Sequence, residues 1–479
     1  MKRNISAILL FAMLASLAAC GGTDTPADET TVGGDTTAAV TEAPSPLESL
    51  GAKDFGGAVY TIIDGNDYQA TYQNLPGESM NGDIINDGLF ERGRYMEDHY
   101  NVKMEYRVMT KPQACNQTQQ SVLAGEKNCD LLISGLAGGG LATLATSGIL
   151  ANLTDYDELA LDQPWWSTLM NSSIRMNDRL YMTSGDVVPT MYCCLSCVFL
   201  NSSLLADYKL EQDYYSLVRE GKWTWDVVKS ITADYNRDLN GDDVITAEED
   251  FFGLVYMINE VTTGAAICGS GVPFSTMEKD GIKLDLASER MSAVIDKLTG
   301  ILLPLSYDNQ QACITAFEEG RAIALMHLAA SGKNWFREME DDFMILPNPK
   351  YDEAQERYYS YANTWTTAYI GIPLTASDKH TGFITEALAR YSYENIRPKF
   401  YDLVLKQKAA RDEGSGEMLD IIFESAYLDF NAIYDFGKTR SALQQVLFND
   451  AELASSIASA QTAAEAEIEN FTAIWSGNE

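Results

Sequence analysis

The segment 238–249 has the most specific spacing of potential metal ligands in the chain, and it reads Asp-Leu-Asn-Gly-Asp-Asp-Val-Ile-Thr-Ala-Glu-Glu. Side-chain oxygens stand at positions 1, 3, 5 and 12, and an apolar residue stands at position 8. This is the spacing of an EF-hand-type calcium loop, in which a hard cation is surrounded by oxygen ligands. The sequence therefore predicts a structural calcium ion held by the side chains of Asp238, Asn240, Asp242 and Glu249, the carbonyl of Val244 and, through water, Thr246.

Position 6 of this segment departs from the EF-hand pattern. It is occupied by Asp243, where EF-hand loops have glycine, although Asp adopts the left-handed conformation more readily than most residues. Other registers fail, because they place Ile245 or Ala247 at position 12. The alternative is an acidic Asn-Gly turn that binds no metal.

Motifs of catalysis are absent from the sequence. The three histidines, His99, His327 and His380, do not form an HExxH pair, and the glycines 138–140 are not followed by the Lys-Ser/Thr of a phosphate loop. There is no GxSxG motif. We expect no enzyme and no catalytic cofactor. Because carboxylates are abundant, a secreted, lipid-anchored carbohydrate-active hydrolase stays open as an alternative.

Three of the eight cysteines, Cys193, Cys194 and Cys197, crowd into one apolar run typical of a strand. A CxxC pair without a second pair is a weak metal or redox signal, so we predict buried structural thiols. Without Cys20 the count is seven, and an odd number of thiols cannot all pair within the chain.

The first twenty residues have the pattern of a secretory signal: Lys2 and Arg3, an apolar run over 5–17, and Leu-Ala-Ala before Cys20. Their end resembles the lipobox of bacterial lipoproteins. That resemblance implies cleavage after residue 19, fatty acyl chains such as palmitate on Cys20, and anchoring to the outer face of the bacterial cell membrane. An ordinary secretory signal with a chance cysteine is the alternative. The Gly-, Thr- and acid-rich residues 20–51 predict a flexible tether after the signal peptide 1–19.

Composition limits the class of protein. The chain has 479 residues, with 46% hydrophobic and 22% charged residues, which is usual for a globular protein. The length beyond the tether suits two large lobes better than one core. The net charge of −35 argues against nucleic acid as a partner, because phosphate binding needs clustered Lys and Arg.

Strand and helix patterns alternate along the chain. Strands are predicted at 58–63, 101–108 and 129–135, with helices between them, and this order implies an α/β fold with a mainly parallel sheet. Ligands bind beyond the carboxyl ends of such strands, which places Tyr68 and Ser134 at the edge of a cleft. A second alternation is predicted from strands at 192–200, 322–327, 343–346 and 368–372, helices at 224–233, 287–300 and 310–320, and a surface helix at 451–474.

Several of these segments, in their order, resemble family 1 of the bacterial extracellular solute-binding proteins, which includes maltose-binding protein. The segments are 95–106, 129–134, 144–153, 178–183, 221–226, 319–327 and 343–349. The resemblance implies a two-lobe, type II periplasmic-binding-protein-like fold with hinge crossings, in a monomer that delivers a solute to the permease of an ABC importer. It assigns 52–185 plus 367–425 to lobe 1, and 186–366 plus 426–479 to lobe 2. The closing part of the sequence is unlike maltose-binding protein, so maltose specificity does not follow.

A ligand site between the lobes would need aromatic platforms and hydrogen-bonding side chains if the solute is a mono- or oligosaccharide. The chain has 7 Trp and 25 Tyr, and Trp365 is the strongest candidate because it lies where the family's chain returns between the lobes. For each aromatic, ordinary core packing is the alternative. A structural surface adhesin is a third, less favoured function. The predicted ligand-binding residues are Tyr68, Ser134, Asp186, Tyr192, His327, Trp335, Asn363 and Trp365.

Overall fold

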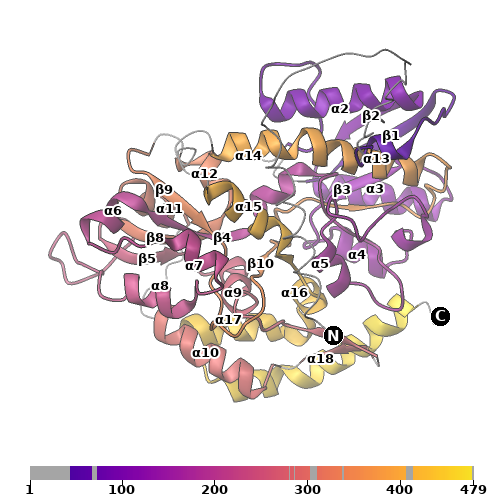
Figure 1. The fold of residues 1–479 in the computed structure, drawn as a ribbon. Helices are drawn as coiled ribbons and strands as arrows, with labels where there is room; N and C mark the ends of the chain where they lie inside the picture. Colours follow the sequence, from indigo (N-terminus) through magenta and orange to yellow (C-terminus); the bar gives the residue numbers. More distant parts are fainter. Residues whose placement is uncertain are drawn as a thin grey trace, which may run out of the picture. The chain divides into compact units, whose positions relative to one another are not determined.

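The structure is a computed structural model that describes residues 44–66, 73–279, 281–284, 286–302, 310–336, 339–405 and 414–476 (Figure 1). Ser45–Glu479 form one compact unit. The signal peptide, Cys20 and most of the predicted tether lie outside the described residues, and so does Tyr68. Within the described part of the chain, no helix combines the length and the apolar character that crossing a membrane requires.

The first sheet has four strands in the order β11-β3-β1-β2. Strand β1 pairs in parallel with β2 and β3, as predicted, whereas β11 runs antiparallel to β3. Helices α2 and α3 contact these strands, and α13 packs against α2 (Figure 1). The strands are β1 (Ala58–Asp64), β2 (Val102–Val108), β3 (Leu131–Ser134) and β11 (Tyr369–Gly371). The helices on this part of the chain are α2 (Ile84–Tyr100), α3 (Lys111–Leu123), α4 (Leu141–Thr146), α5 (Thr168–Ser173) and α13 (Thr381–Asn395).

The second sheet has the order β5-β8-β4-β9 and is mostly antiparallel, unlike the first. Only β5 and β8 run in parallel, because β4 lies between β8 and β9 and points against both. All seven residues of β8 are buried, which fits a central strand. The strands are β4 (Ser196–Asn201), β5 (Phe252–Tyr256), β8 (Ala322–Leu328) and β9 (Phe343–Leu346), beside a hairpin of β6 (Thr276–Glu278) and β7 (Gly281–Lys283). The helices are α6 (Ser202–Asp207), α7 (Tyr214–Arg219), α8 (Trp225–Thr232), α9 (Glu260–Ile267), α10 (Glu289–Leu302), α11 (Gln310–Glu318) and α12 (Ala330–Asn334).

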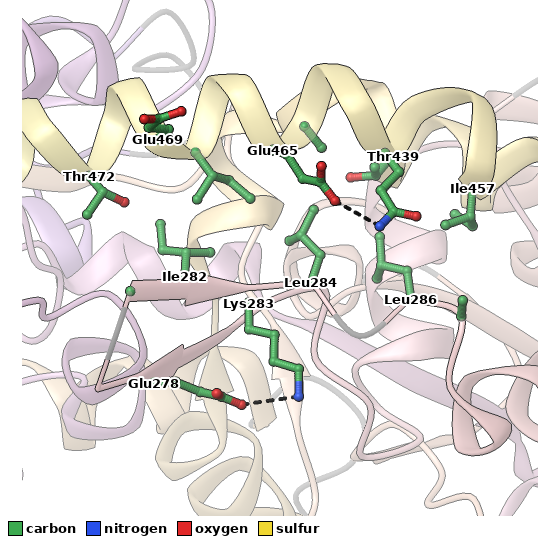
Figure 2. A pocket seen from close by; sticks show the side chains of 15 residues that line it. Glu278, Ile282, Lys283, Leu284, Leu286, Thr439, Ile457, Glu465, Glu469 and Thr472 are labelled. Carbon is green, nitrogen blue, oxygen red and sulfur yellow. Dashed lines mark hydrogen bonds and ion pairs between the residues drawn. The ribbon is translucent and has the colours of Figure 1, made fainter.

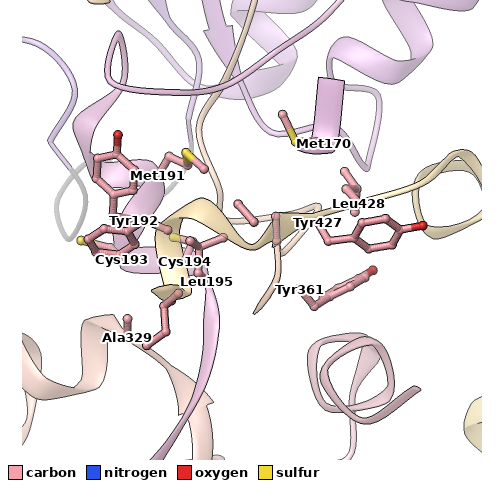
Figure 3. Packing of buried hydrophobic residues seen from close by; sticks show 14 of the residues in the cluster. Met170, Met191, Tyr192, Cys193, Cys194, Leu195, Ala329, Tyr361, Tyr427 and Leu428 are labelled. Atoms are coloured by element: carbon pink, nitrogen blue, oxygen red, sulfur yellow. The ribbon is translucent and has the colours of Figure 1, made fainter. Parts of the chain in front are cut away.

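Three chain segments that connect the two sheets pack against one another. Strand β10 (Ser360–Tyr361) pairs in parallel with β12 (Ala426–Tyr427), and Leu195 forms an isolated bridge with Ala362. Figure 3 shows the buried side chains at this junction, which include Tyr192, Cys194, Tyr361 and Tyr427. The crossing predicted from the sequence is therefore a well-packed apolar junction. We call residues 360–367 the crossing segment.

The thiols at this junction differ in part from the prediction. Cys197 lies in β4, but Cys193 and Cys194 end a 3₁₀ helix, Pro189–Cys194. Proline at the first helical position has the backbone angle that favours this helix and lacks the N–H that a strand would need. All seven cysteines in the described residues are buried, as expected for structural thiols, and burial raises the pKa of Cys194 and Cys197.

Both ends of the folded unit differ from the predicted boundaries. Packing begins at Ser45 rather than 52, because Ser45 and Leu47 are hydrogen bonded to Glu394 of α13. The predicted surface helix is present as α18 (Leu453–Ser476), but it buries Trp475. The ring of Trp475 lies against Tyr181, a residue that the sequence analysis assigned to the other lobe. The remaining lobe boundaries stay predictions. The last elements are α14 (Arg397–Leu405), α15 (Gly414–Glu424), α16 (Phe430–Tyr434), α17 (Thr439–Asn449) and α18 (Leu453–Ser476).

Candidate functional site

A cavity of about 240 Å³ brings together three of the predicted ligand-binding residues, His327, Trp335 and Asn363. His327 belongs to β8, Trp335 follows α12, and Asn363 comes from the crossing segment. Residues from three elements, between 8 and 36 positions apart in the sequence, therefore line one cavity at the junction of the two sheets. The other lining residues are Asn259, Val261, Thr262, Gln310, Met326, Leu328 and Thr366.

The cavity wall is polar but uncharged. Burial lowers the pKa of His327 to about 4, so its imidazole is neutral at physiological pH. Its Nδ1 lies 2.7 Å from the hydroxyl of Ser331, and its ring meets Trp335 edge to face at 5.9 Å. Amide, hydroxyl and neutral imidazole groups can exchange hydrogen bonds with a neutral polar ligand, and none of them favours an ionic one.

Trp365 does not line the cavity, although its neighbours Asn363 and Thr366 do. Its side chain is 46% exposed, whereas the other described tryptophans outside the cavity are buried. The side-chain oxygen of Asn363 accepts the backbone N–H of Trp365 at 2.7 Å, which fixes the turn that presents the indole. The ammonium of Lys111 lies 5.2 Å from the ring centroid. Gly138 must remain small here, because a Cβ at that position would lie 2.8 Å from the indole.

Ser134 does not line the cavity. It is fully buried at the end of β3, opposite Tyr369 in the sheet, and its hydroxyl lies 3.8 Å from the sulfur of Cys115. The prediction placed Ser134 correctly at a strand end but did not account for the crossing segment, which covers that end. Backbone N–H groups of Leu136 and Ala137 donate to the carbonyl of Thr364 there.

Asp186 and Tyr192 lie apart from the cavity and serve a structural ion pair. The guanidinium of Arg397 contacts both carboxylate oxygens of Asp186, at 2.9 and 2.6 Å, and donates to the hydroxyl of Tyr192 at 2.8 Å. Asp186 is fully buried, and a buried carboxylate is retained only where such partners replace its water. These contacts occupy both side chains, and Tyr192 and Arg397 line a separate cavity of about 370 Å³. A ligand-binding role for Asp186 and Tyr192 stays a prediction.

The predicted calcium ligands lie on one loop between α8 and β5. The carboxylate of Asp238 accepts the backbone N–H groups of Gly241 and Asp243, at 2.6 and 2.8 Å. The φ of Asp243 is 63°, the left-handed conformation that glycine provides at position 6 of an EF-hand loop. The amide of Asn240 donates to Glu249 at 2.6 Å.

The buried Asp250, which the sequence analysis did not single out, also holds this loop. Its carboxylate accepts the backbone N–H groups of Leu239 and Thr246, at 2.8 and 2.7 Å, and such bonds lower the pKa of Asp250. The donor set, with carboxylates, an amide and a carbonyl on one loop, fits a hard cation. Calcium binding stays a prediction.

A different cluster meets the geometric requirement for a metal site within the described residues. Ligand atoms of Asp130, Asp378 and His380 lie within 4.8 Å of one another. The ammonium of Lys127, however, already lies 3.0 Å from Asp130 and 2.5 Å from Asp378. The cluster therefore has its own cation, and we interpret it as a structural ion-pair network.

A larger cavity, of about 680 Å³, lies between α18 and the segment around β7 (Figure 2). Ile282, Leu284 and Leu286 face the helix there, and Glu465 and Glu469 lie along its rim. No aromatic side chain lines it, and none of the predicted ligand-binding residues does. It lacks the flat platform that a sugar face requires, so the smaller cavity at the junction is the better candidate site.

The sequence analysis missed four polar residues of the candidate site. Two of them had a local signal: Asn259 caps α9 by accepting the backbone N–H of Thr262, and an Asn three residues before a Thr at a helix start is a recognisable cap. Thr366 is a neighbour of Trp365 in the sequence and could have been inferred from it. For Gln310 the sequence contains no comparable signal.

No family model matches this sequence, and no curated protein matches it. Among solved structures, the maltose/maltodextrin-binding domain MalE from Bdellovibrio bacteriovorus bound to maltotriose is similar, with a TM-score of 0.52, 15% identity, and coverage of 86% of this chain and 100% of that chain. A cyclo/maltodextrin-binding protein complexed with maltotetraose has a TM-score of 0.55, 11% identity, and coverage of 90% of this chain and 99% of that chain. The chain thus has the two-lobe, type II periplasmic-binding fold predicted from its sequence.

Proposed function

We propose that this protein is the substrate-binding component of an ABC importer and that it captures a neutral carbohydrate at the junction of its lobes. One observation carries the proposal: the cavity lined by His327, Trp335 and Asn363 is uncharged and rich in hydrogen-bonding groups, and the exposed Trp365 lies in the sequence between two of its lining residues, Asn363 and Thr366. A sugar presents hydroxyl edges and apolar faces, and this wall complements both.

The similarity of the fold to solved binding proteins also supports the proposal of carbohydrate capture. The two similar solved structures hold maltotriose and maltotetraose, and both are binding proteins. Their low identity transfers no residue roles, so the class of ligand rests on the chemistry of the cavity in this chain. We infer a mono- or oligosaccharide without assigning its identity.

Delivery to a permease and attachment to the membrane belong to the same proposal. Acyl chains on Cys20 and the tether that follows would keep a monomeric binding protein near the outer face of the membrane. A tethered protein has a higher effective concentration at its permease than a diffusing one. Mass spectrometry of the membrane fraction tests the anchor by the mass of the N-terminal peptide.

Isothermal titration calorimetry against a panel of saccharides that includes glucose, maltotriose and maltotetraose tests ligand capture. We expect one saccharide to bind at one site per chain, and Trp365→Ala to weaken binding by at least tenfold, because one face of the ligand loses its platform. Leu374→Ala is the matched control, since Leu374 is 56% exposed and lies outside the cavity.

Two results would contradict the proposal. Unchanged affinity in Trp365→Ala would remove the indole from the site, and no binding by the unaltered protein across the panel would remove carbohydrate as the ligand. Chromatography of the recovered saccharide separates capture from hydrolysis, because a hydrolase would release shorter products over many turnovers.

A further inference from the structure

Thr364 is the residue of the crossing segment that both lobes hold. On the side of the first sheet, its carbonyl accepts the backbone N–H groups of Leu136 and Ala137, at 2.9 and 3.1 Å, from the loop after β3. On the side of the second sheet, its hydroxyl donates to the carboxylate of Glu260 at 2.7 Å. The backbone N–H of Thr364 also donates to the same carboxylate oxygen of Glu260, at 3.4 Å. The carbonyl of Thr364 is therefore bonded to one lobe, and its hydroxyl and N–H are bonded to the other.

Glu260 is the first residue of α9 and does not line the cavity, but its neighbours do. Its second carboxylate oxygen accepts a hydrogen bond from Arg440 at 2.6 Å, and Arg440 also donates to the carbonyl of Ala432 at 2.9 Å. The side chains of Glu260 and Arg440 are only 14% and 16% exposed, so water screens this pair less than a surface ion pair. Arg440 thus fixes one carboxylate oxygen of Glu260 and leaves the other oriented toward Thr364.

This arrangement fixes the two polar walls of the cavity relative to each other. Asn259 and Thr262 flank Glu260 on α9, and Asn363 and Thr366 flank Thr364 on the crossing segment. The Glu260–Thr364 hydrogen bond joins these two elements at the cavity, and the ring of Tyr361 packs against Gly264 of α9 further along the crossing segment. Ligand hydroxyls that bind both walls need the spacing that this bond sets.

We propose that Glu260 is a positioning residue. Its hydrogen bond to Thr364, which we call the clasp, fixes the spacing of the cavity walls before the ligand binds. The same bond couples the position of the first lobe to that of the crossing segment. The inference rests on the proposed function, because it assigns Glu260 to the same saccharide site. The proposal adds a specific connection between the lobes. A shift of the cavity wall at Thr364 also moves the carbonyl to which Leu136 and Ala137 donate. A ligand that tightens the wall thereby biases the orientation of the lobes.

The test compares Thr364→Val, which removes the hydroxyl at nearly constant volume, with Thr364→Ser, which keeps it. We expect Thr364→Val to weaken the affinity for the saccharide found by calorimetry, with maltotetraose as the first probe, about tenfold. Thr364→Ser should stay within about threefold of the unaltered protein. Thr299→Val is the matched control, because the Thr299 hydroxyl donates to the carbonyl of Ile295 within α10 and Thr299 does not line the cavity.

Hydrogen exchange of the ligand-free protein gives a second readout that needs no saccharide. The amides of Leu136 and Ala137 should exchange at least five times faster in Thr364→Val and in Glu260→Ala, but not in Thr364→Ser or Thr299→Val. If the unaltered protein binds no saccharide, the proposed function is wrong. The exchange rates then still test whether the Glu260–Thr364 hydrogen bond stabilises the loop after β3. Unchanged exchange at both amides, or equal affinities of the Val and Ser variants, would overturn the inference.

Discussion

The imidazole of His327 is a neutral hydrogen-bonding group in the wall of the cavity, because burial disfavours its charged form and lowers its pKa to about 4. In the unfolded chain an ordinary histidine has a pKa near 6.5. Between these two values the unfolded state binds more protons than the folded state. The stability contributed by the neutral imidazole is therefore complete above about pH 6.5 and is lost as the pH falls toward 4.

The substitution His327→Gln removes this titration and retains an uncharged polar group. We expect the difference in unfolding free energy between the two proteins to change by up to about 3 kcal/mol from pH 7 to pH 4, with the unaltered protein losing more stability. Urea denaturation at several pH values measures it. A difference that stays constant over this range would show that His327 titrates normally in the folded protein.

Asp186 shows what reasoning from single residues leaves out. Its place in the sequence, where the chain enters the crossing, suggested a ligand for sugar hydroxyls, but the carboxylate is committed to Arg397, which lies 211 residues away. Nothing near Asp186 in the sequence indicates that partner. His327 and Asn363 line a common cavity, as their predicted positions on a strand and on the crossing suggested, whereas Trp335 reaches that cavity from the end of α12, a helix that was not predicted.

At the scale of elements, the loop 238–249 is the segment whose local sequence predicts the most. Its Asx turns and the positive φ of Asp243 follow from residue types and spacing within twelve positions, without any distant contact. The buried Asp250 adds an anchor that ties the loop to the start of β5. Both features are also those of an acidic Asx turn, so calcium binding by this loop stays a prediction.

We expect CaCl₂ to bind at one site per chain in a calorimetric titration and to raise the unfolding free energy by about 2.7 kcal/mol at a hundredfold excess over its Kd. The double substitution Asp242→Asn and Glu249→Gln should abolish both effects, because it removes two charged ligands at nearly constant shape. MgCl₂ serves as the comparison cation. If CaCl₂ gives no heat of binding and no increase in the unfolding free energy, the loop is not a calcium site.

Helix α18 shows what the pattern of one element can and cannot tell. Its composition, rich in Ala, Ser and Glu, predicts a helix, and the helix is present. Buried residues recur along it at Ile457, Ala460, Ala464, Phe471 and Trp475, a helical spacing that marks an apolar face. The sequence thus contains the signal that the helix packs on a partner, but not which elements that partner comprises.

At the scale of the whole molecule, the net charge of −35 means that acidic side chains repel one another over much of the surface. Folding brings these charges closer together than in the unfolded chain, so salt should favour the folded state by screening. We expect Tm to rise by a few degrees when NaCl increases from about 10 to about 200 mM. Choline chloride should give the same rise, and a fall in Tm with both salts would contradict this account.

The sequence by itself determined the α/β alternation, the parallel pairing around β1, the buried state of the cysteines and the geometry of the loop 238–249. Each depends on periodicity or spacing within some twenty residues, where local sterics and hydrogen bonding act. Only the tertiary structure decided that β4 runs antiparallel to its neighbours, that Arg397 takes Asp186, and that Thr364 lies between Glu260 and the loop after β3. These depend on contacts across roughly 100 to 230 residues, and many different pairings of buried polar groups would satisfy the same local patterns until the packed chain selects one.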